Sequence, residues 1–221
     1  MENLGFITVV DHPQHGLIGG YLVLNQAGRP LEFHCTNPVK PSKTQEILFG
    51  VALEPYLYGE QIARTLIAKS KLKVVVILTN IVSVLAVKGL TNLPVAYIFD
   101  KLFRDRIAGG EVDLTNTDNS KKIISEELNE SLRSFGIEDG SLQTGGKSDG
   151  NEISTIPQVT GLDVEFWQGY AVGNRTVAIP GEQSIEREQL LDELKRISRN
   201  VDLLEPFTRI QLAIAETHNY T

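Results

Sequence analysis

The sequence contains little cysteine, since Cys35 is the only one among its 221 residues. A single cysteine excludes an intrachain disulfide framework and any zinc site built from several cysteines. Glycine-rich phosphate loops of the GxGxxG or Walker type are also missing from the sequence. We therefore expect a protein without a bound cofactor.

Long apolar runs are missing as well. The most apolar stretch, residues 74–87, is interrupted by Thr79 and Asn80. It is shorter than the roughly 20 residues that a membrane-spanning helix needs. The N-terminus has neither the basic segment nor the long apolar segment of a signal peptide. These absences predict a soluble, cytoplasmic protein that does not enter a membrane.

Positive charge is in deficit too. The formal net charge is -7 at pH 7, whereas a protein that binds a phosphate backbone needs a clustered basic surface. The composition therefore predicts no nucleic-acid partner. Five lysines do form a local enrichment, which we interpret as the solvated ends of helices. They are Lys40, Lys43, Lys69, Lys71 and Lys73.

The clearest structural signal that is present is the segment 16–36. Residues 17–25 are apolar, residues 31–36 alternate between apolar and polar, and the link contains Gly28, which can take the positive φ of a tight turn. This pattern predicts an antiparallel hairpin, and an apolar run at 6–11 adds a third strand to form a meander. Because side chains alternate along a strand, two faces are predicted. Leu31, Phe33 and Cys35 should face the core, and Glu32, His34 and Thr36 should face away from it.

Helical and extended patterns alternate further along the chain. Helices are predicted at 42–49, where Ser42 and Gln45 fit a capping box, and at 56–69, where Glu54 suits the positive end of the helix dipole. A β-branched strand at 73–79, a helix at 81–88 capped by Asn80 and a strand at 94–99 form a βαβ unit. The remaining predictions are a helix at 121–134, a flexible loop at about 136–155, a hairpin at 162–179 and helices at 185–199 and 206–215.

Together these elements predict a single α+β domain over residues 1–221. Its mixed sheet would contain an N-terminal antiparallel meander, a central βαβ unit and a C-terminal hairpin followed by two helices. The segment 136–155 would interrupt this domain, either as a linker or as a functional flap.

Two arrangements of histidine are not expected to be functional. His34 should lie roughly 20 Å along the predicted strands from His12 and His15, so the three cannot share one metal, and no metal is expected. Cys35 and His34 should point to opposite faces of their strand, so His34 cannot activate Cys35 as a nucleophile.

Two other sets of residues are candidates for chemistry. Glu32 beside His34 could orient a general base, or could form only the polar face of a half-exposed sheet. With Asp100, they are the catalytic candidates if the protein is an enzyme. Ligands of α/β units bind outside the carboxyl ends of parallel strands. This rule predicts a polar or anionic ligand at Thr79, Asn80, Asp100 and Arg104, although Asn80 could act only as a helix cap.

The functional prediction rests mainly on the absence of a convergent catalytic set. Tyr56 and Tyr58 suit a protein interface or a pocket rim. The sequence therefore favours a non-catalytic protein-interaction or regulatory subunit of a cytoplasmic assembly, with a protein partner. The alternative is a small-molecule enzyme, a hydrolase or transferase, with its site at the carboxyl ends of the parallel strands. The sequence leaves open whether the protein is an enzyme and which oligomeric state it adopts.

Overall fold

The computed structural model describes residues 3–99, 167–180 and 184–218. The strands are β1 (Leu4–His12), β2 (Gly16–Leu24), β3 (Pro30–Cys35), β4 (Val76–Thr79), β5 (Val95–Ile98), β6 (Trp167–Val172) and β7 (Arg175–Pro180). The helical segments are α1 (Lys43–Phe49), η1 (Gly50–Ala52), α2 (Leu53–Pro55), η2 (Tyr56–Ala63), α3 (Arg64–Lys69), η3 (Val82–Leu90), α5 (Ser184–Ser198) and α6 (Glu205–His218). The helix predicted at 121–134 and the loop predicted at 136–155 lie outside the described residues.

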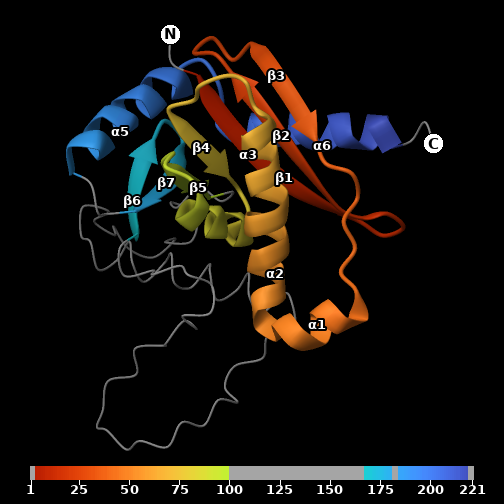
Figure 1. Ribbon diagram of the computed structural model, residues 1–221. Coiled ribbons are helices and arrows are strands. Elements are labelled where there is room, and N and C mark those ends of the chain that lie inside the picture. The colour runs from red at the N-terminus through yellow and green to blue at the C-terminus, as the bar shows by residue number, and fades with distance from the viewer. Residues whose placement is uncertain (1–2, 100–166, 181–183, 219–221) are drawn as a thin grey trace, which may run out of the picture.

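The strands form one mixed seven-stranded sheet in the order β3-β2-β1-β4-β5-β7-β6 (Figure 1). β1, β2 and β3 are antiparallel neighbours, whereas β1, β4 and β5 run parallel to one another. β7 is antiparallel to β5, and β6 is antiparallel to β7. The predicted α+β fold is therefore confirmed, with its meander, its βαβ unit of β4, η3 and β5, and its C-terminal hairpin followed by α5 and α6.

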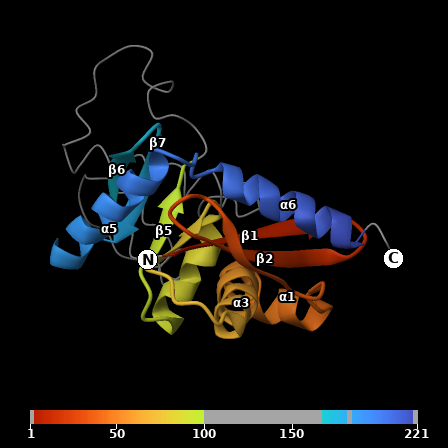
Figure 2. The same ribbon diagram turned by 90° about the horizontal axis from the view of Figure 1, so that it is seen from above.

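Helices cover both faces of the sheet (Figure 2). One core cluster joins the sheet to η2, α3 and η3, and the other joins it to α5 and α6. β4 is buried on both faces, as its β-branched and apolar residues require. Within the described residues, no helix combines the length and the apolar character needed to span a bilayer.

The first hairpin has the expected turn, but the helices that pack on it bury other side chains than the sequence predicted. Gly28 has a φ of 73° at the turn, and Asn25 Oδ1 accepts hydrogen bonds from the backbone N–H groups of Ala27 and Arg29. The alternation of faces along β3 is as predicted, but Leu31 and Phe33 are 44% and 38% exposed. The prediction that this face lies in the core is therefore wrong for Leu31 and Phe33, whereas Cys35 packs against a core cluster. α6 packs on β1 and β2, while α3 packs on the opposite face of β2 and β3.

The helix that follows α1 contains a π-helical segment, η2, between α2 and α3. The Gln61 side chain donates to Tyr56 Oη at 2.8 Å, five residues earlier, which matches the wider spacing of a π-helix. Gly59 lies so close to η3 that a Cβ on it would be 2.7 Å from Ala86 Cβ and 2.9 Å from Val87 N. This close contact fixes the helix against η3 and sets which side chains face β3.

Candidate functional site

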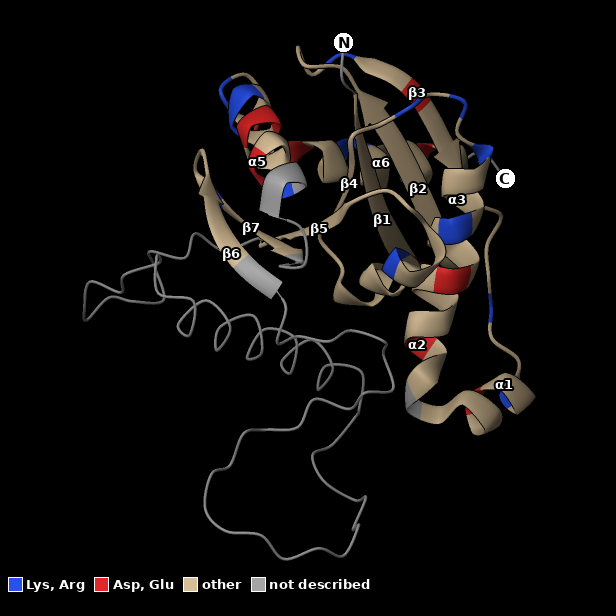
Figure 3. Ribbon diagram, turned by 60° about the vertical axis from the view of Figure 1, so that its left-hand side comes forward, with Lys and Arg blue, Asp and Glu red and all other residues tan. Residues whose placement is uncertain are grey.

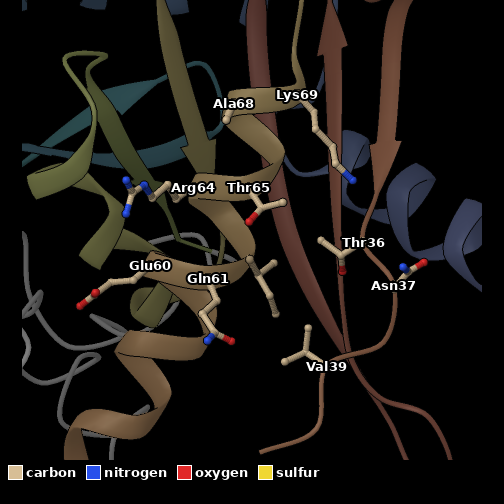
Figure 4. A pocket seen from close by; sticks show the side chains of 10 residues that line it. Thr36, Asn37, Val39, Glu60, Gln61, Arg64, Thr65, Ala68 and Lys69 are labelled. Carbon is tan, nitrogen blue, oxygen red and sulfur yellow. The ribbon is translucent and has the colours of Figure 1, made fainter.

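A groove of about 720 Å³ lies between the helix η2–α3 and the chain that leaves β3 (Figure 4). Its walls combine hydroxyl, amide, charged and apolar side chains. They are Thr36, Asn37 and Val39 on the strand side and Glu60, Gln61, Ile62, Arg64, Thr65, Ala68 and Lys69 on the helix side. The sequence analysis missed this groove, because its two walls are far apart in the chain and no motif joins them.

The cations of the groove come from α3. Arg64 and Lys69 are exposed, and neither forms an ion pair with another residue of the described part of the chain. The Lys69 side chain extends from the helix toward the strand side, and Thr65 and Gln61 also project into the groove (Figure 4). Arg64 points along the other side of the helix in the same view.

Aromatic side chains adjoin the groove beside Gln61. The ring of Tyr56, whose hydroxyl accepts from Gln61, stacks on Phe49 with the ring centroids 4.3 Å apart and the planes at 26°. Tyr56 is half-buried, whereas Tyr58 is only 7% exposed and belongs to the core. Of the two tyrosines predicted at an interface or pocket rim, Tyr56 therefore lies near a groove and Tyr58 packs inside.

Glu32 and His34 lie together on the α3 side of β3. His34 Nε2 is 2.7 Å from Glu32 Oε1, and Glu32 also accepts from Ser70 Oγ and from the backbone N–H groups of Lys71 and Leu72. Burial alone would raise the pKa of Glu32, but these hydrogen bonds outweigh it and lower the pKa to about 2. Glu32 thus holds the end of α3 against β3. Its proposed third partner, Asp100, lies outside the described residues.

The other histidines and the cysteine do not join this pair. Cys35 packs against the core cluster beneath α5 and α6, on the face opposite to His34. His12 Nδ1 accepts from the backbone N–H groups of Gln14 and His15. No group of three His, Cys, Asp or Glu side chains that could hold a metal is found among the residues that the structure describes.

Two buried polar groups near the carboxyl end of β4, one on β1 and one just after β4, lack partners among the described residues. The Thr79 hydroxyl is engaged, since it accepts from the N–H of Ile81 at 3.1 Å. Asn80 does not cap η3, whose N-cap is Ile81 without a side-chain hydrogen bond, so that prediction is wrong. Asn80 Oδ1 and Thr8 Oγ1 are instead buried without a hydrogen-bond partner in the described part of the chain. Asn80 remains a proposed ligand-binding residue, and Arg104 lies outside the described residues.

A buried carboxyl group lies near the same strand ends. The Ser83 hydroxyl donates to Glu54 Oε1, while Glu54 Oε2 has no partner among the residues that the structure describes. Burial raises the pKa of Glu54, although the bond from Ser83 opposes this effect. Burial also raises the pKa of Tyr58, and the charges of Glu54 and Asp11 add to the rise. The sequence indicated only a helix-dipole role for Glu54, because Ser83 is distant in the chain.

No family model matches the sequence, and no curated protein matches it either. Among solved structures, it is similar to a variant of endonuclease V from Ciona intestinalis in complex with a 23mer DNA containing an inosine followed by a ribo-adenosine. That match has a TM-score of 0.42 and 16% identity, and it covers 97% of this chain and 86% of the other. A second structure, Ciona intestinalis endonuclease V with a 24mer DNA of the same kind, has a TM-score of 0.42 and 17% identity, with 97% and 87% covered.

These findings correct two predictions. A non-catalytic interaction subunit with a protein partner was expected, and nucleic acid was excluded as a partner. The two solved structures are of nucleases bound to DNA, so neither prediction is retained. At this identity and TM-score, however, the likeness assigns no activity to this chain.

Net charge is an average over two unlike parts of the chain. Residues 1–99 contain eight Lys and Arg against six Asp and Glu, whereas residues 100–221 contain 13 against 22. A ligand responds to the local potential of the surface that it meets rather than to the total charge.

Proposed function

We propose that the protein binds single-stranded nucleic acid in the groove between η2–α3 and the chain that follows β3. The observation that carries the proposal is Lys69, an ammonium group without an ion-pair partner in the described residues that extends over a groove lined by hydroxyl and amide groups (Figure 4). Phosphate oxygens are recognised by this combination of Lys or Arg with Ser, Thr, Asn and Gln side chains.

The aromatic pair beside the groove favours a single strand. Proteins that bind single strands join a positively charged groove to aromatic rings on which unstacked bases pack. Tyr56 and Phe49 provide stacked rings next to Gln61, a residue of the groove wall. A strand whose phosphates follow α3 would bring its bases toward these rings.

The surroundings of the groove have the appropriate charge. Lys and Arg residues lie on α3, on the connection from β3 to α1, and on the segment that follows α3 (Figure 3). Lys43 differs from these other cations because it forms an ion pair with Glu46, with Nζ 2.9 Å from the carboxylate. The remaining cations could release counterions from a bound phosphate backbone, which is the main source of affinity in nucleic-acid binding.

The proposal is tested by fluorescence anisotropy with a labelled oligonucleotide of about 12 nucleotides at several salt concentrations. Affinity should fall as salt rises. Lys69→Ala should weaken binding about three- to tenfold and reduce the salt slope by about 0.7. Lys43→Ala is the matched control, because it removes the same charge from a lysine that lies outside the groove wall.

Three outcomes would overturn the proposal. Binding that does not depend on salt would exclude a phosphate-backbone interaction. Equal losses of affinity in Lys69→Ala and Lys43→Ala would show that the oligonucleotide does not bind in the groove. Stronger binding of a duplex of the same length would show that the ligand is a duplex and not a single strand. In that case Tyr56→Leu would leave affinity unchanged, because no unstacked base would pack on the Tyr56 ring.

A further inference from the structure

His34 lies next to the groove on the same strand face as Thr36, one of its lining residues. The register of β2 and β3 pairs His34 with Tyr21, whose side chain belongs to the core cluster formed with η2 and α3. His34 therefore faces α3 rather than α6. Its side chain is 26% exposed, so part of the imidazole ring can be reached from solvent.

The orientation of the His34 ring is fixed through one of its two nitrogens. Nε2 contacts Glu32 Oε1 at 2.7 Å, and Glu32 is itself held by Ser70 Oγ at 2.9 Å and by the N–H of Lys71 at 3.0 Å. The carboxylate cannot follow a rotating ring, because these donors come from a different segment of the chain. Nδ1 makes no hydrogen bond to the described residues, and it is left to contact a ligand.

The charged and titratable groups that face His34 come from three segments. Glu32 lies on the same strand and stays anionic over the neutral range, because its hydrogen bonds outweigh burial and lower its pKa to about 2. Burial and the charge of Glu32 raise the pKa of Tyr21 to about 12, against the effect of its hydrogen bond with Ser70, so Tyr21 stays neutral. Lys69 and Lys71 flank Ser70, which donates to the same Glu32 carboxylate that His34 contacts, and they contribute positive charge.

We propose that protonated His34 and Lys69 together form a phosphate subsite at the end of the groove next to Glu32. This inference rests on the proposed function and names one contact within it. Imidazole changes its charge between about pH 5 and pH 8. A phosphate group bound between the two cations relieves their mutual repulsion and accepts a charge-assisted hydrogen bond from Nδ1–H.

Proton-linked binding follows from this arrangement. A ligand that prefers the protonated form of a group binds more tightly as the pH falls through the range in which that group titrates. The oligonucleotide should therefore bind with uptake of a proton. Lys69 alone would give a salt dependence without a pH dependence in this range, because an ordinary ammonium group stays charged throughout it.

The experiment compares oligonucleotide affinity at about pH 6 and about pH 8 at constant ionic strength. The expected result is about five- to tenfold tighter binding at the lower pH. His34→Gln should abolish this pH dependence. His15→Gln, which removes a histidine from the β1–β2 turn, is the matched control and should keep the full pH dependence.

A second measurement uses the unaltered protein, so its result does not depend on whether His34→Gln folds. In the unaltered protein, the ring proton signals of the histidines are followed by NMR while inorganic phosphate is added. The His34 signal should move and its titration midpoint should rise, while the His12 and His15 signals stay in place. A pH dependence that survives in His34→Gln, or a His34 signal that ignores phosphate, would overturn the inference. If the pH dependence fails but binding still depends on salt, the proposal that the groove binds nucleic acid stands without the His34 subsite. If the oligonucleotide does not bind at either pH, the proposed function itself is wrong.

Discussion

Glu32 is the residue on which the β3–α3 junction depends. Its carboxylate accepts from His34, Ser70, Lys71 and Leu72, so one side chain ties an edge strand to the end of a helix 38 residues later. A carboxylate with this many donors contributes to stability only while it is ionised. Its low pKa therefore makes the junction sensitive to acid.

The first prediction follows from the sign of this shift. The pKa of Glu32 is lowered from 4.5 to about 2 in the folded protein, so the stabilisation is complete above about pH 4.5 and is lost as the pH falls toward 2. Glu32→Gln should lower the free energy of unfolding by about 2 kcal/mol near neutral pH. The difference from the unaltered protein should shrink steadily in acid, as measured by urea unfolding at several pH values.

Glu46→Gln is the control for this measurement. Glu46 is an exposed member of an ion pair with Lys43 within the single helix α1, and surface pairs of this kind contribute little. Its substitution should leave the pH profile unchanged. A Glu32→Gln profile parallel to that of the unaltered protein down to acid pH would show that the carboxylate is not the group that titrates.

At the scale of the element, the helix from α2 to α3 decides which side chains reach the groove. A π-helical segment adds a residue to each turn, and it rotates the residues that follow relative to a continuous α-helix. Gln61 and Thr65 consequently face β3, while Glu60 points to the other side (Figure 4). The segment is held in this state by its packing on η3 through Gly59.

Gly59→Ala tests the role of this packing. The added Cβ would meet Ala86 Cβ at 2.7 Å and the backbone of Val87 at 2.9 Å, and backbone cannot move aside as a flexible side chain can. The substitution should lower the free energy of unfolding by about 1–3 kcal/mol. Gly89→Ala is matched to it, because a Cβ at Gly89, within η3, has nothing within 4 Å. Chemical denaturation should separate the two variants, and equal stabilities would mean that η2 and η3 can separate without cost.

Sequence patterns predicted the elements better than they predicted the site. The capping box of Ser42 and Gln45 is present at α1, and Gly28 takes its positive φ, because both signals are local. The groove depends on contacts such as the one between Glu32 and Ser70, which no periodicity records. Alternation along β3 separated Glu32 from Leu31 correctly. It could not tell which face a helix would cover, because that depends on the length and direction of α3 and α6.

At the scale of the whole molecule, charge is distributed unevenly over the fold. α3 and its cations lie on one face of the sheet, and α5 lies on the other (Figures 2 and 3). Two of the basic residues of the first 99 positions, Arg64 and Lys69, line the groove, while much of the acidic excess belongs to the later part of the chain. A polyanion would approach the α3 face even though the total charge repels it, since potentials decay over about 10 Å at moderate salt.

Two substitutions that change the net charge equally distinguish local from total charge. Lys69→Glu reverses a charge on the groove wall, and Lys195→Glu reverses one on the exposed surface of α5. Lys69→Glu should weaken oligonucleotide binding at least about tenfold, whereas Lys195→Glu should change it less than about twofold. Melting temperatures of both variants should match that of the unaltered protein, because both lysines are exposed and unpaired with acids in the described residues. Equal losses of affinity would mean that the total charge, and not the α3 face, controls binding.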